Sequence, residues 1–177
     1  HYHKSAGRFL TEARVDKARR LLATTRDTVV DIGAASGYDS LSSFNANFRR
    51  LTGLCPSDYR SLPGRQSFTL ALSGERILDS LRFQGRDLRS LCERFSGNTL
   101  TKAAMIGDVP AALELSAAGR AVDCRVIVPG PAQIDMFAAH AVTLRLLGLA
   151  PDPAPFERMA ARHARLRPLV ERRRDRK

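Results

Sequence analysis

Residues 28–60 of the chain read TVVDIGAASGYDSLSSFNANFRRLTGLCPSDYR, and this stretch decides the fold of the N-terminal part. Thr28 predicts the start of a short helix, because its hydroxyl can accept a hydrogen bond from a backbone N–H that the first turn leaves free. Gly37 predicts the end of that helix, since glycine adopts a positive φ at little cost. Asp39 or Ser40 then caps a second helix, so the stretch indicates two short helices joined by a tight turn.

The second helix carries large apolar side chains at helical spacing. Its predicted buried stripe consists of Leu41, Phe44, Phe48 and Leu51. Gly53 predicts the end of this helix. In the first helix, we expect Ile32 and Ala35 to face inward. Gly33 or Ala34 is small enough to let the two helices cross closely.

We expect the face of the second helix opposite this stripe to be exposed. Its residues, with those at its margins, are Ser42, Ser43, Asn45, Ala46, Arg49 and Arg50. Two short helices that cross through a tight turn meet the physical requirement of a helix-turn-helix, whose second helix enters a DNA major groove about 12 Å wide. Serine and asparagine can bond base edges, and we expect Arg49 and Arg50 to hold phosphates. The alternative is an ordinary solvated face.

A longer helix is predicted upstream, over residues 9–23, which contain neither glycine nor proline. Two sets of residues recur there at helical spacing, namely Leu10, Ala13, Lys17 and Leu21, and Val15, Ala18 and Leu22. Arg14, Arg19 and Arg20 on this helix are candidates for additional contacts with a DNA backbone. A solvated basic face is the alternative here as well.

Charge is distributed unevenly along the chain, whose 177 residues carry a net charge of +11. Residues 1–65 hold 11 Lys/Arg against 6 Asp/Glu, a net charge of +5. Residues 66–157 hold 9 against 10, a net charge of −1, and residues 158–177 hold 9 against 2, a net charge of +7. Basic ends favour a polyanionic partner, because neutralised phosphates release their counterions. An arginine-rich composition would explain the total charge but not the neutral middle.

The spacing of the residues in 28–60 resembles the C-terminal signature of the AraC family of regulators. The matching residues are Asp31-Ile32-Gly33, Gly37-Tyr38, Ser43-Phe44, Phe48-Arg49-Arg50, Gly53-Leu54, Pro56-Ser57 and Tyr59-Arg60. The resemblance implies that residues 1–62 form a partial DNA-binding domain with the second of two helix-turn-helix units. It also implies sequence-specific binding to double-stranded DNA and transcriptional regulation. Gly33 departs from the family, which usually has alanine there, and Ala46 stands where a long polar side chain is common.

The hydrophobic period changes after a short linker at Ser61–Arg65. Phe68, Leu70 and Leu72 alternate with other residues, which indicates a strand. The further predicted elements are a short helix at 76–83, strands at 90–96, 100–106, 110–116 and 121–128, and helices at 132–149 and 154–171. Turn residues between the four later strands favour an antiparallel meander. The predicted fold class is therefore α+β: a helical helix-turn-helix domain followed by a small antiparallel sheet packed with helices.

Residues 66–171 resemble the N-terminal domain of bacterial 3-methyladenine DNA glycosylases of the AlkA type. The resemblance rests on Ser67-Phe68-Thr69-Leu70, Gly85-Arg86-Asp87, Glu93-Arg94, Leu144-Arg145-Leu146-Leu147-Gly148-Leu149, Asp152-Pro153, Phe156-Glu157-Arg158 and Arg165-Leu166-Arg167-Pro168-Leu169-Val170. The order of the two domains resembles that of Ada-like alkylation-repair fusions, and we expect the chain to be such a fusion truncated at both ends. The resemblance implies a regulator linked to the DNA alkylation damage response. Alternatively, the chain is the non-catalytic N-terminal part of a glycosylase whose helix-hairpin-helix catalytic domain is missing. We expect residues 172–177 to be a basic tail.

The remaining polar residues indicate no catalysis, cofactor or metal site. His140 lies in an apolar helical run, where we expect a histidine that is partly exposed or has satisfied hydrogen bonds rather than a base. Cys55, Cys92 and Cys124 lie more than thirty residues apart, so we expect buried thiols in a cytoplasmic protein. No apolar run reaches the roughly 18 residues of a membrane span. The expected partners are double-stranded DNA and a missing catalytic domain or partner chain, with no membrane; a truncated remnant without an independent role remains an alternative.

Overall fold

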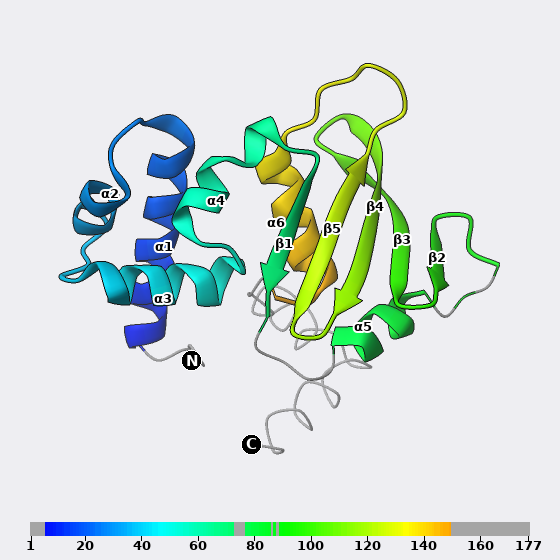
Figure 1. Ribbon diagram of the computed structural model, residues 1–177, viewed down its shortest axis with the longest axis horizontal. Helices are drawn as coiled ribbons and strands as arrows, with labels where there is room; N and C mark the ends of the chain where they lie inside the picture. Colours follow the sequence, from blue (N-terminus) through cyan, green and yellow to red (C-terminus); the bar gives the residue numbers. More distant parts are fainter. Residues whose placement is uncertain (1–5, 73–76, 86, 88, 150–177) are drawn as a thin grey trace, which may run out of the picture.

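The computed structural model describes residues 6–72, 77–85, 87 and 89–149. The helices are α1 (Ala6–Thr24), α2 (Val29–Ala35), α3 (Leu41–Thr52), α4 (Pro56–Arg60), a 3₁₀ turn (Leu62–Gly64), α5 (Ile77–Gln84) and α6 (Met136–Leu146). The strands are β1 (Ser67–Ala71), β2 (Glu93–Ser96), β3 (Thr99–Ile106), β4 (Val109–Ala118) and β5 (Ala121–Ile127). Helices α1 to α4 form a helical unit, residues 6–65, which is followed by a sheet unit, residues 66–149 (Figure 1). The predicted α+β class is confirmed.

Helix α1 buries one narrow seam, because α2, α3 and α4 all pack against it. Val15, Ala18 and Leu22 form this seam, as one of the two predicted sets required. The other set, which also recurs at helical spacing, is mostly exposed, and only Leu21 of it packs against the core. Leu10 is 50% exposed, and Ala13 and Lys17 are exposed as well. The Lys17 ammonium group instead donates a hydrogen bond to the carbonyl of Ala35 at 2.6 Å.

The caps and turn of the helix-turn-helix confirm the interpretation of its boundaries. Thr28 Oγ1 accepts a hydrogen bond from the backbone N–H of Asp31 at 3.1 Å and so caps α2. Ser40, rather than Asp39, caps α3, since its Oγ accepts from the N–H of Ser43 at 3.2 Å. Gly37 lies between the helices with a φ of +87°. Gly53 ends α3 in the left-handed region with a φ of +73°.

Two aromatic side chains anchor α3. Phe44 and Phe48 are both 0% exposed. Tyr38, Phe44, Phe48 and Tyr59 form a chain of ring contacts whose successive centroids lie 5.3, 5.6 and 5.5 Å apart. These contacts join the turn, α3 and α4, so the orientation of α3 is set by packed rings.

Some predicted inward-facing residues lie elsewhere. Leu41 is 43% exposed, because it begins α3 beside the open groove that it lines together with Val29. Ala35 is exposed and does not face inward, whereas Ile32 does. The small residue at the helix crossing is Gly33, which is buried; Ala34 is exposed. A Cβ at Gly33 would lie 3.0 Å from Cδ1 of Phe44, so the close crossing favours glycine here.

The sheet has the order β1-β5-β4-β3-β2 and is antiparallel throughout. The meander predicted for the later four strands is confirmed, with ends shifted by a few residues. Glycines at Gly97, Gly107 and Gly119 turn the chain with φ near +60°. The first strand of the sheet unit, β1, pairs with the last, β5, and the sequence pattern did not predict this pairing. The structure also confirms the predicted short helix as α5.

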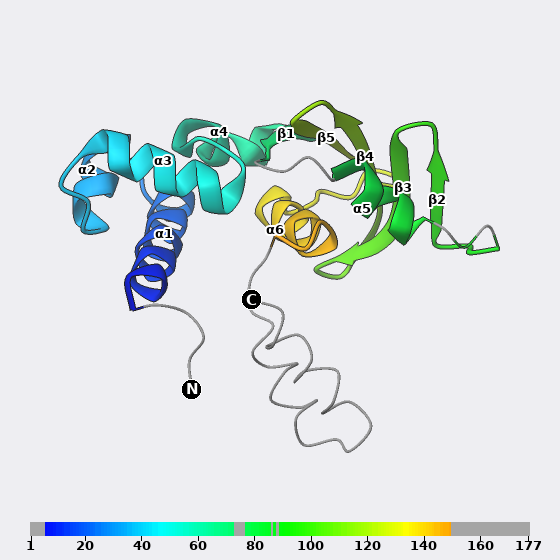
Figure 2. The same cartoon turned by 90° about the horizontal axis from the view of Figure 1, so that it is seen from below.

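Helix α6 covers one face of the sheet, where Met136 and Leu144 are buried (Figure 2). It is shorter than the predicted 132–149, because Asp135 caps its start by accepting hydrogen bonds from two backbone N–H groups of the first turn. The predicted helix at 154–171 and the basic tail at 172–177 lie outside the described residues.

The predicted linker is a packed connection rather than a spacer. Leu62 is fully buried within the 3₁₀ turn. Residues Pro56–Arg60 form the short helix α4, which the sequence analysis did not predict. The two units therefore share one continuous hydrophobic core.

The cysteines differ from the prediction of three buried thiols. All are free; Cys124 is buried, Cys55 is half-buried and Cys92 is exposed. Cys92 precedes the edge strand β2, where nothing on the described chain covers it. Among the described residues, no group of three or more His, Cys, Asp or Glu side chains is placed to hold a metal ion. No described helix combines the length and the apolar character needed to cross a membrane.

Candidate nucleic-acid interface

The residues proposed from the sequence to contact DNA all lie on the exposed surface of α3. They are Ser42, Ser43, Asn45, Ala46, Arg49 and Arg50, and each is exposed. The buried Phe44 and Phe48 hold the opposite face, so α3 presents a polar surface while its other side is fixed in the core. The structure divides this surface into two flanks.

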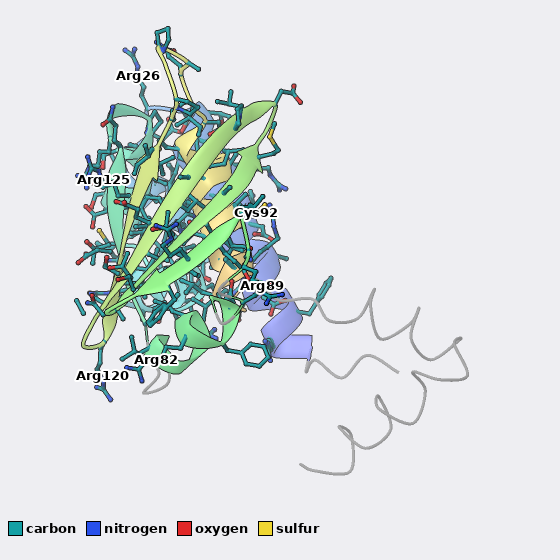
Figure 3. All side chains as sticks on the ribbon, turned by 90° about the vertical axis from the view of Figure 1, so that its right-hand side faces the viewer. Arg26, Arg82, Arg89, Cys92, Arg120 and Arg125 are labelled. Carbon is teal, nitrogen blue, oxygen red and sulfur yellow. The ribbon has the colours of Figure 1, made fainter. Side chains whose placement is uncertain are left out.

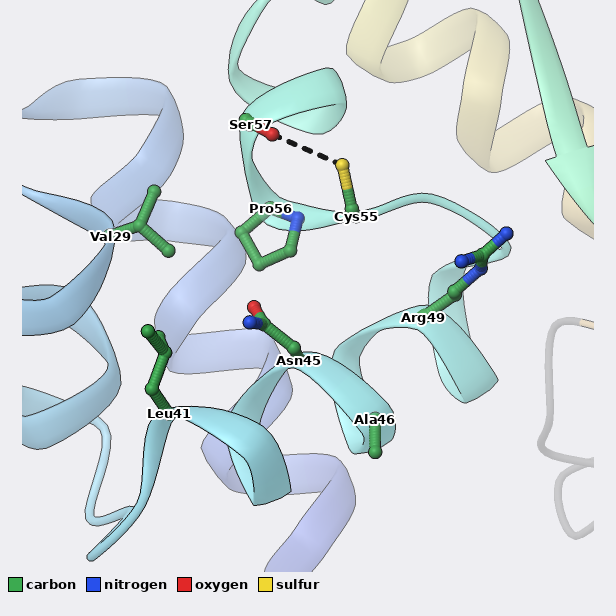
Figure 4. Close-up of a pocket in the computed structure, with 8 residues that line it drawn as sticks. All are labelled: Val29, Leu41, Asn45, Ala46, Arg49, Cys55, Pro56 and Ser57. Carbon is green, nitrogen blue, oxygen red and sulfur yellow. Dashed lines mark hydrogen bonds between the residues drawn. The ribbon is translucent and has the colours of Figure 1, made fainter.

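The first flank borders an open groove of about 570 Å³ between α3 and its neighbouring helices (Figure 4). The groove is lined by Val29, Leu41, Asn45, Ala46, Arg49, Cys55, Pro56 and Ser57. Asn45 and Arg49 lie one turn apart on α3 and supply an amide and a guanidinium group. Ser57, in the first turn of α4, adds a hydroxyl group. The flank thus combines hydrogen-bonding groups with a positive charge.

The second flank consists of Ser43, Asn47 and Arg50, which follow one another along α3. The Asn47 amide donates to the carbonyl of Ser43 at 2.9 Å, and Arg50 donates to the Asn47 side-chain oxygen at 3.0 Å. Arg50 also lies near Tyr38: burial raises the pKa of that phenol, while the charges of Arg14 and Arg50 act to lower it. Arg49 and Arg50, which the sequence interpretation placed together, therefore serve different flanks.

The arginines of α1 have structural partners. The guanidinium carbon of Arg14 lies 5.7 Å from the ring centroid of Tyr38. Arg19 donates to the hydroxyl of Tyr59 at 3.2 Å and pairs with Asp16 at 3.3 Å. Arg20 is exposed. Of the three candidates for backbone contacts, Arg14 and Arg19 are thus already engaged in holding α1 against the turn and α4.

The groove residues outside α3 were missed at the sequence level. Val29 begins α2, Cys55 precedes α4 as its N-cap, and Pro56 and Ser57 begin α4. A proline at the first position of a helix was the available signal, because it marks a new helix that opens beside the end of α3. Cys55 is bonded within this loop, since its thiol donates to Asp58 at 2.9 Å and lies 3.1 Å from Ser57 Oγ.

His140 has no access to the surface. It is 0% exposed, and burial lowers its pKa to about 4, so the imidazole is neutral near pH 7. Its Nε2 lies 2.8 Å from the carbonyl oxygen of Thr52, an acceptor at the end of α3. The side chain therefore serves the packing between the two units.

Comparisons with known proteins agree with this geometry. Residues 1–61 match the family model described as "Helix-turn-helix domain". An HTH-type transcriptional regulator of Mycobacterium tuberculosis is 37% identical over 57 residues, which are 32% of this chain and 22% of that protein. The F1 operon positive regulatory protein of Yersinia pestis is 35% identical over 57 residues, 32% of this chain and 19% of that protein. The melibiose operon regulatory protein of Escherichia coli is 34% identical over 62 residues, 34% and 20% of the two chains.

The chain thus spans only about a fifth of the length of these relatives. No solved structure shows a significant match to it. The family model falls on the helical unit, in which α2, the turn and α3 lie. Residues 1–61 therefore carry an AraC-type helix-turn-helix domain, similar to the one in these transcriptional regulators.

Proposed function

We propose that the chain binds duplex DNA by inserting the exposed surface of α3 into the major groove, and that this binding regulates transcription. The observation that carries the proposal is the division of α3 itself. Phe44 and Phe48 are fully buried, whereas Ser42, Ala46 and Arg49 are exposed. A major groove about 12 Å wide admits one helix presented in this way.

The chemistry of the exposed residues suits such a contact. Ser42 and Asn45 can bond base edges, and the methyl group of Ala46 can contact the methyl group of a thymine. Arg49, which borders the groove beside α4, is suited to a phosphate. The net charge of +5 on residues 1–65 favours the approach of DNA.

The experiment compares two double variants with the same change of charge. Arg49→Ala with Arg50→Ala removes two cations from α3, and Arg89→Ala with Arg94→Ala removes two from the sheet unit. Arg89 and Arg94 are exposed near β2, at the opposite end of the molecule from α3 (Figure 1, Figure 3). Duplex affinity is measured over a range of salt concentrations for the wild type and both variants.

The α3 variant is expected to bind DNA more weakly at low salt. The slope of log affinity against log salt should fall by about 1 for each phosphate that the variant no longer neutralises. The β2 variant is expected to keep the wild-type affinity and slope. Equally weakened binding in both variants would mean that net charge alone drives binding, and the assignment to α3 would then be wrong.

We further propose that this binding is linked to the DNA alkylation damage response. The support is the resemblance of residues 66–171 to the AlkA-type N-terminal domain, together with an antiparallel sheet packed by helices in the sheet unit. The test is whether a methylating agent changes transcription from promoters that the chain occupies in cells. An unchanged response in cells with and without the chain would contradict the link.

The same resemblance supports the second hypothesis, in which the chain is the non-catalytic N-terminal part of a 3-methyladenine glycosylase. Base release from a methylated duplex by a longer protein that contains this chain would favour this second hypothesis. This chain by itself is expected to release no base, and that expectation stays a prediction. The cytoplasmic location and the missing partner chain also stay predictions.

A further inference from the structure

The C-terminal end of α3 is held by the sheet unit. His140 Nε2, on α6, lies 2.8 Å from the carbonyl oxygen of Thr52. The next carbonyl, that of Gly53, accepts a hydrogen bond from the backbone N–H of Ala71 in β1 at 2.8 Å. Two consecutive carbonyls at the end of α3 are therefore bonded to two different elements of the sheet unit.

These bonds fill a specific need. The last carbonyls of any helix have no partner within the helix and require one outside it. The cap of α3 supplies some of its own bonds: the N–H of Gly53 bonds to the carbonyl of Arg49 at 2.8 Å, and Thr52 Oγ1 donates to the carbonyl of Phe48 at 2.8 Å. The carbonyls of Thr52 and Gly53 are left for the sheet unit rather than for water.

The surroundings of His140 fix how it bonds. The rings of Tyr59 and Phe68 pack edge-to-face against it, with centroids 5.4 and 5.5 Å away. A carbonyl can only accept, so Nε2 of the neutral imidazole carries the proton and donates to Thr52. Nδ1 is buried and has no hydrogen-bond partner within the described part of the chain. The hydrogen bond from Nε2 to Thr52, together with the two ring contacts, therefore holds the imidazole in its orientation.

We propose that His140 is a positioning residue for DNA binding: through Thr52, the sheet unit sets the orientation of α3 and hence of the side chains that meet the duplex. The proposal rests on the proposed function of α3. The last turn of α3 contains both Arg49, which borders the groove, and Thr52, which His140 holds. A small displacement of this turn would move the guanidinium group relative to the phosphates.

The backbone of Gly53 couples the two units in the same place. A Cβ at Gly53 would lie 3.1 Å from Cδ2 and 3.2 Å from Cβ of Leu70, so the end of α3 lies directly against β1. Tyr59, in α4, contacts Phe137 of α6 in a tilted arrangement with ring centroids 5.0 Å apart. The packing is therefore continuous from β1 through α3 to α6, and His140 adds a side-chain hydrogen bond between α6 and α3.

The test replaces His140 in the full chain and measures duplex affinity well below the unfolding temperature of each variant. His140→Gln places an amide near the position of Nε2 and can still donate to Thr52, whereas His140→Leu keeps bulk and removes the bond. The Gln variant is expected to bind DNA as the wild type does, and the Leu variant about tenfold more weakly. His140→Asn has a shorter side chain, whose amide does not reach Thr52, so it should weaken binding as much as His140→Leu does. It is used instead of His140→Leu if that variant does not fold.

Two controls separate the possible causes. Val126→Ala removes buried methyl groups from β5 without touching α3, and it should leave the affinity of the folded protein unchanged. Arg49→Ala reports on the proposed function itself. Weaker binding with Arg49→Ala but wild-type affinity in the Leu and Asn variants would overturn the role of His140 and leave the function of α3 intact. A wild-type chain that does not bind duplex DNA would contradict both the role of His140 and the function of α3. If Val126→Ala weakens binding as much as His140→Leu does, His140 contributes only to stability and the positioning role is wrong.

Discussion

Two glycines set how closely α3 approaches its neighbours. At Gly33 the backbone of α2 meets the ring of Phe44, and at Gly53 the end of α3 meets Leu70. The two positions differ in backbone conformation, because only Gly53 has a positive φ, of +73°. At Gly53 a side chain would therefore meet both a conformational cost and a neighbour from the sheet unit.

Gly53→Ala is expected to lower the free energy of unfolding by more than the roughly 1–2 kcal/mol that the left-handed conformation alone costs an L-residue. The additional decrease arises because the new methyl group would press on Leu70 and disturb the bond from Ala71 to the Gly53 carbonyl. Urea unfolding measures the change.

The matched control is Gly107→Ala. Gly107 has a φ of +60°, but a Cβ there would meet nothing within 4 Å. It should show the conformational cost alone. If both substitutions cost the same, the end of α3 does not lie against β1 as described.

At the scale of elements, the sequence predicted what local chemistry decides. Caps and turn glycines located α2 and α3, and alternation with turn residues located the meander. What it missed depends on contacts between distant residues. Leu41 looked like part of a buried stripe, yet it is 43% exposed, and periodicity cannot reveal which end of a stripe is covered.

The candidate site shows the same limit. All proposed residues of α3 are exposed, because an amphipathic pattern defines both faces of a helix. Their division into two flanks depends on where Tyr38 and α4 lie, and one sequence does not contain that information. The pairing of β1 with β5 and the bond from His140 to Thr52 join residues fifty or more positions apart, beyond the reach of any local pattern.

The N-cap of α3 gives a test at this scale. Ser40→Ala removes the hydroxyl group that accepts from the N–H of Ser43, and it should lower the free energy of unfolding by about 1 kcal/mol. Ser42→Ala, two residues on and exposed, removes an equal group that caps nothing and should leave stability nearly unchanged. Similar decreases for the two variants in urea unfolding would argue against the observed start of α3.

On the scale of the whole molecule, one core joins a basic helical unit to a nearly neutral sheet unit. Tyr59 and Leu62 of the first unit and Phe68 of the second belong to the same buried cluster. The sheet unit therefore packs directly against the end of α3, where Ala71 and His140 bond to the carbonyls of Gly53 and Thr52. The surface proposed to contact a duplex is the exposed face of α3, opposite the side that packs in the core.

The most direct test of this account follows the backbone amide resonances of the ¹⁵N-labelled chain during titration with a duplex. The largest shifts are expected at Ser42, Ala46 and Arg49, with smaller shifts along the last turn of α3 and little change in β2 and β3. Shifts concentrated on the sheet unit, with α3 unaffected, would contradict the claim that α3 meets the DNA.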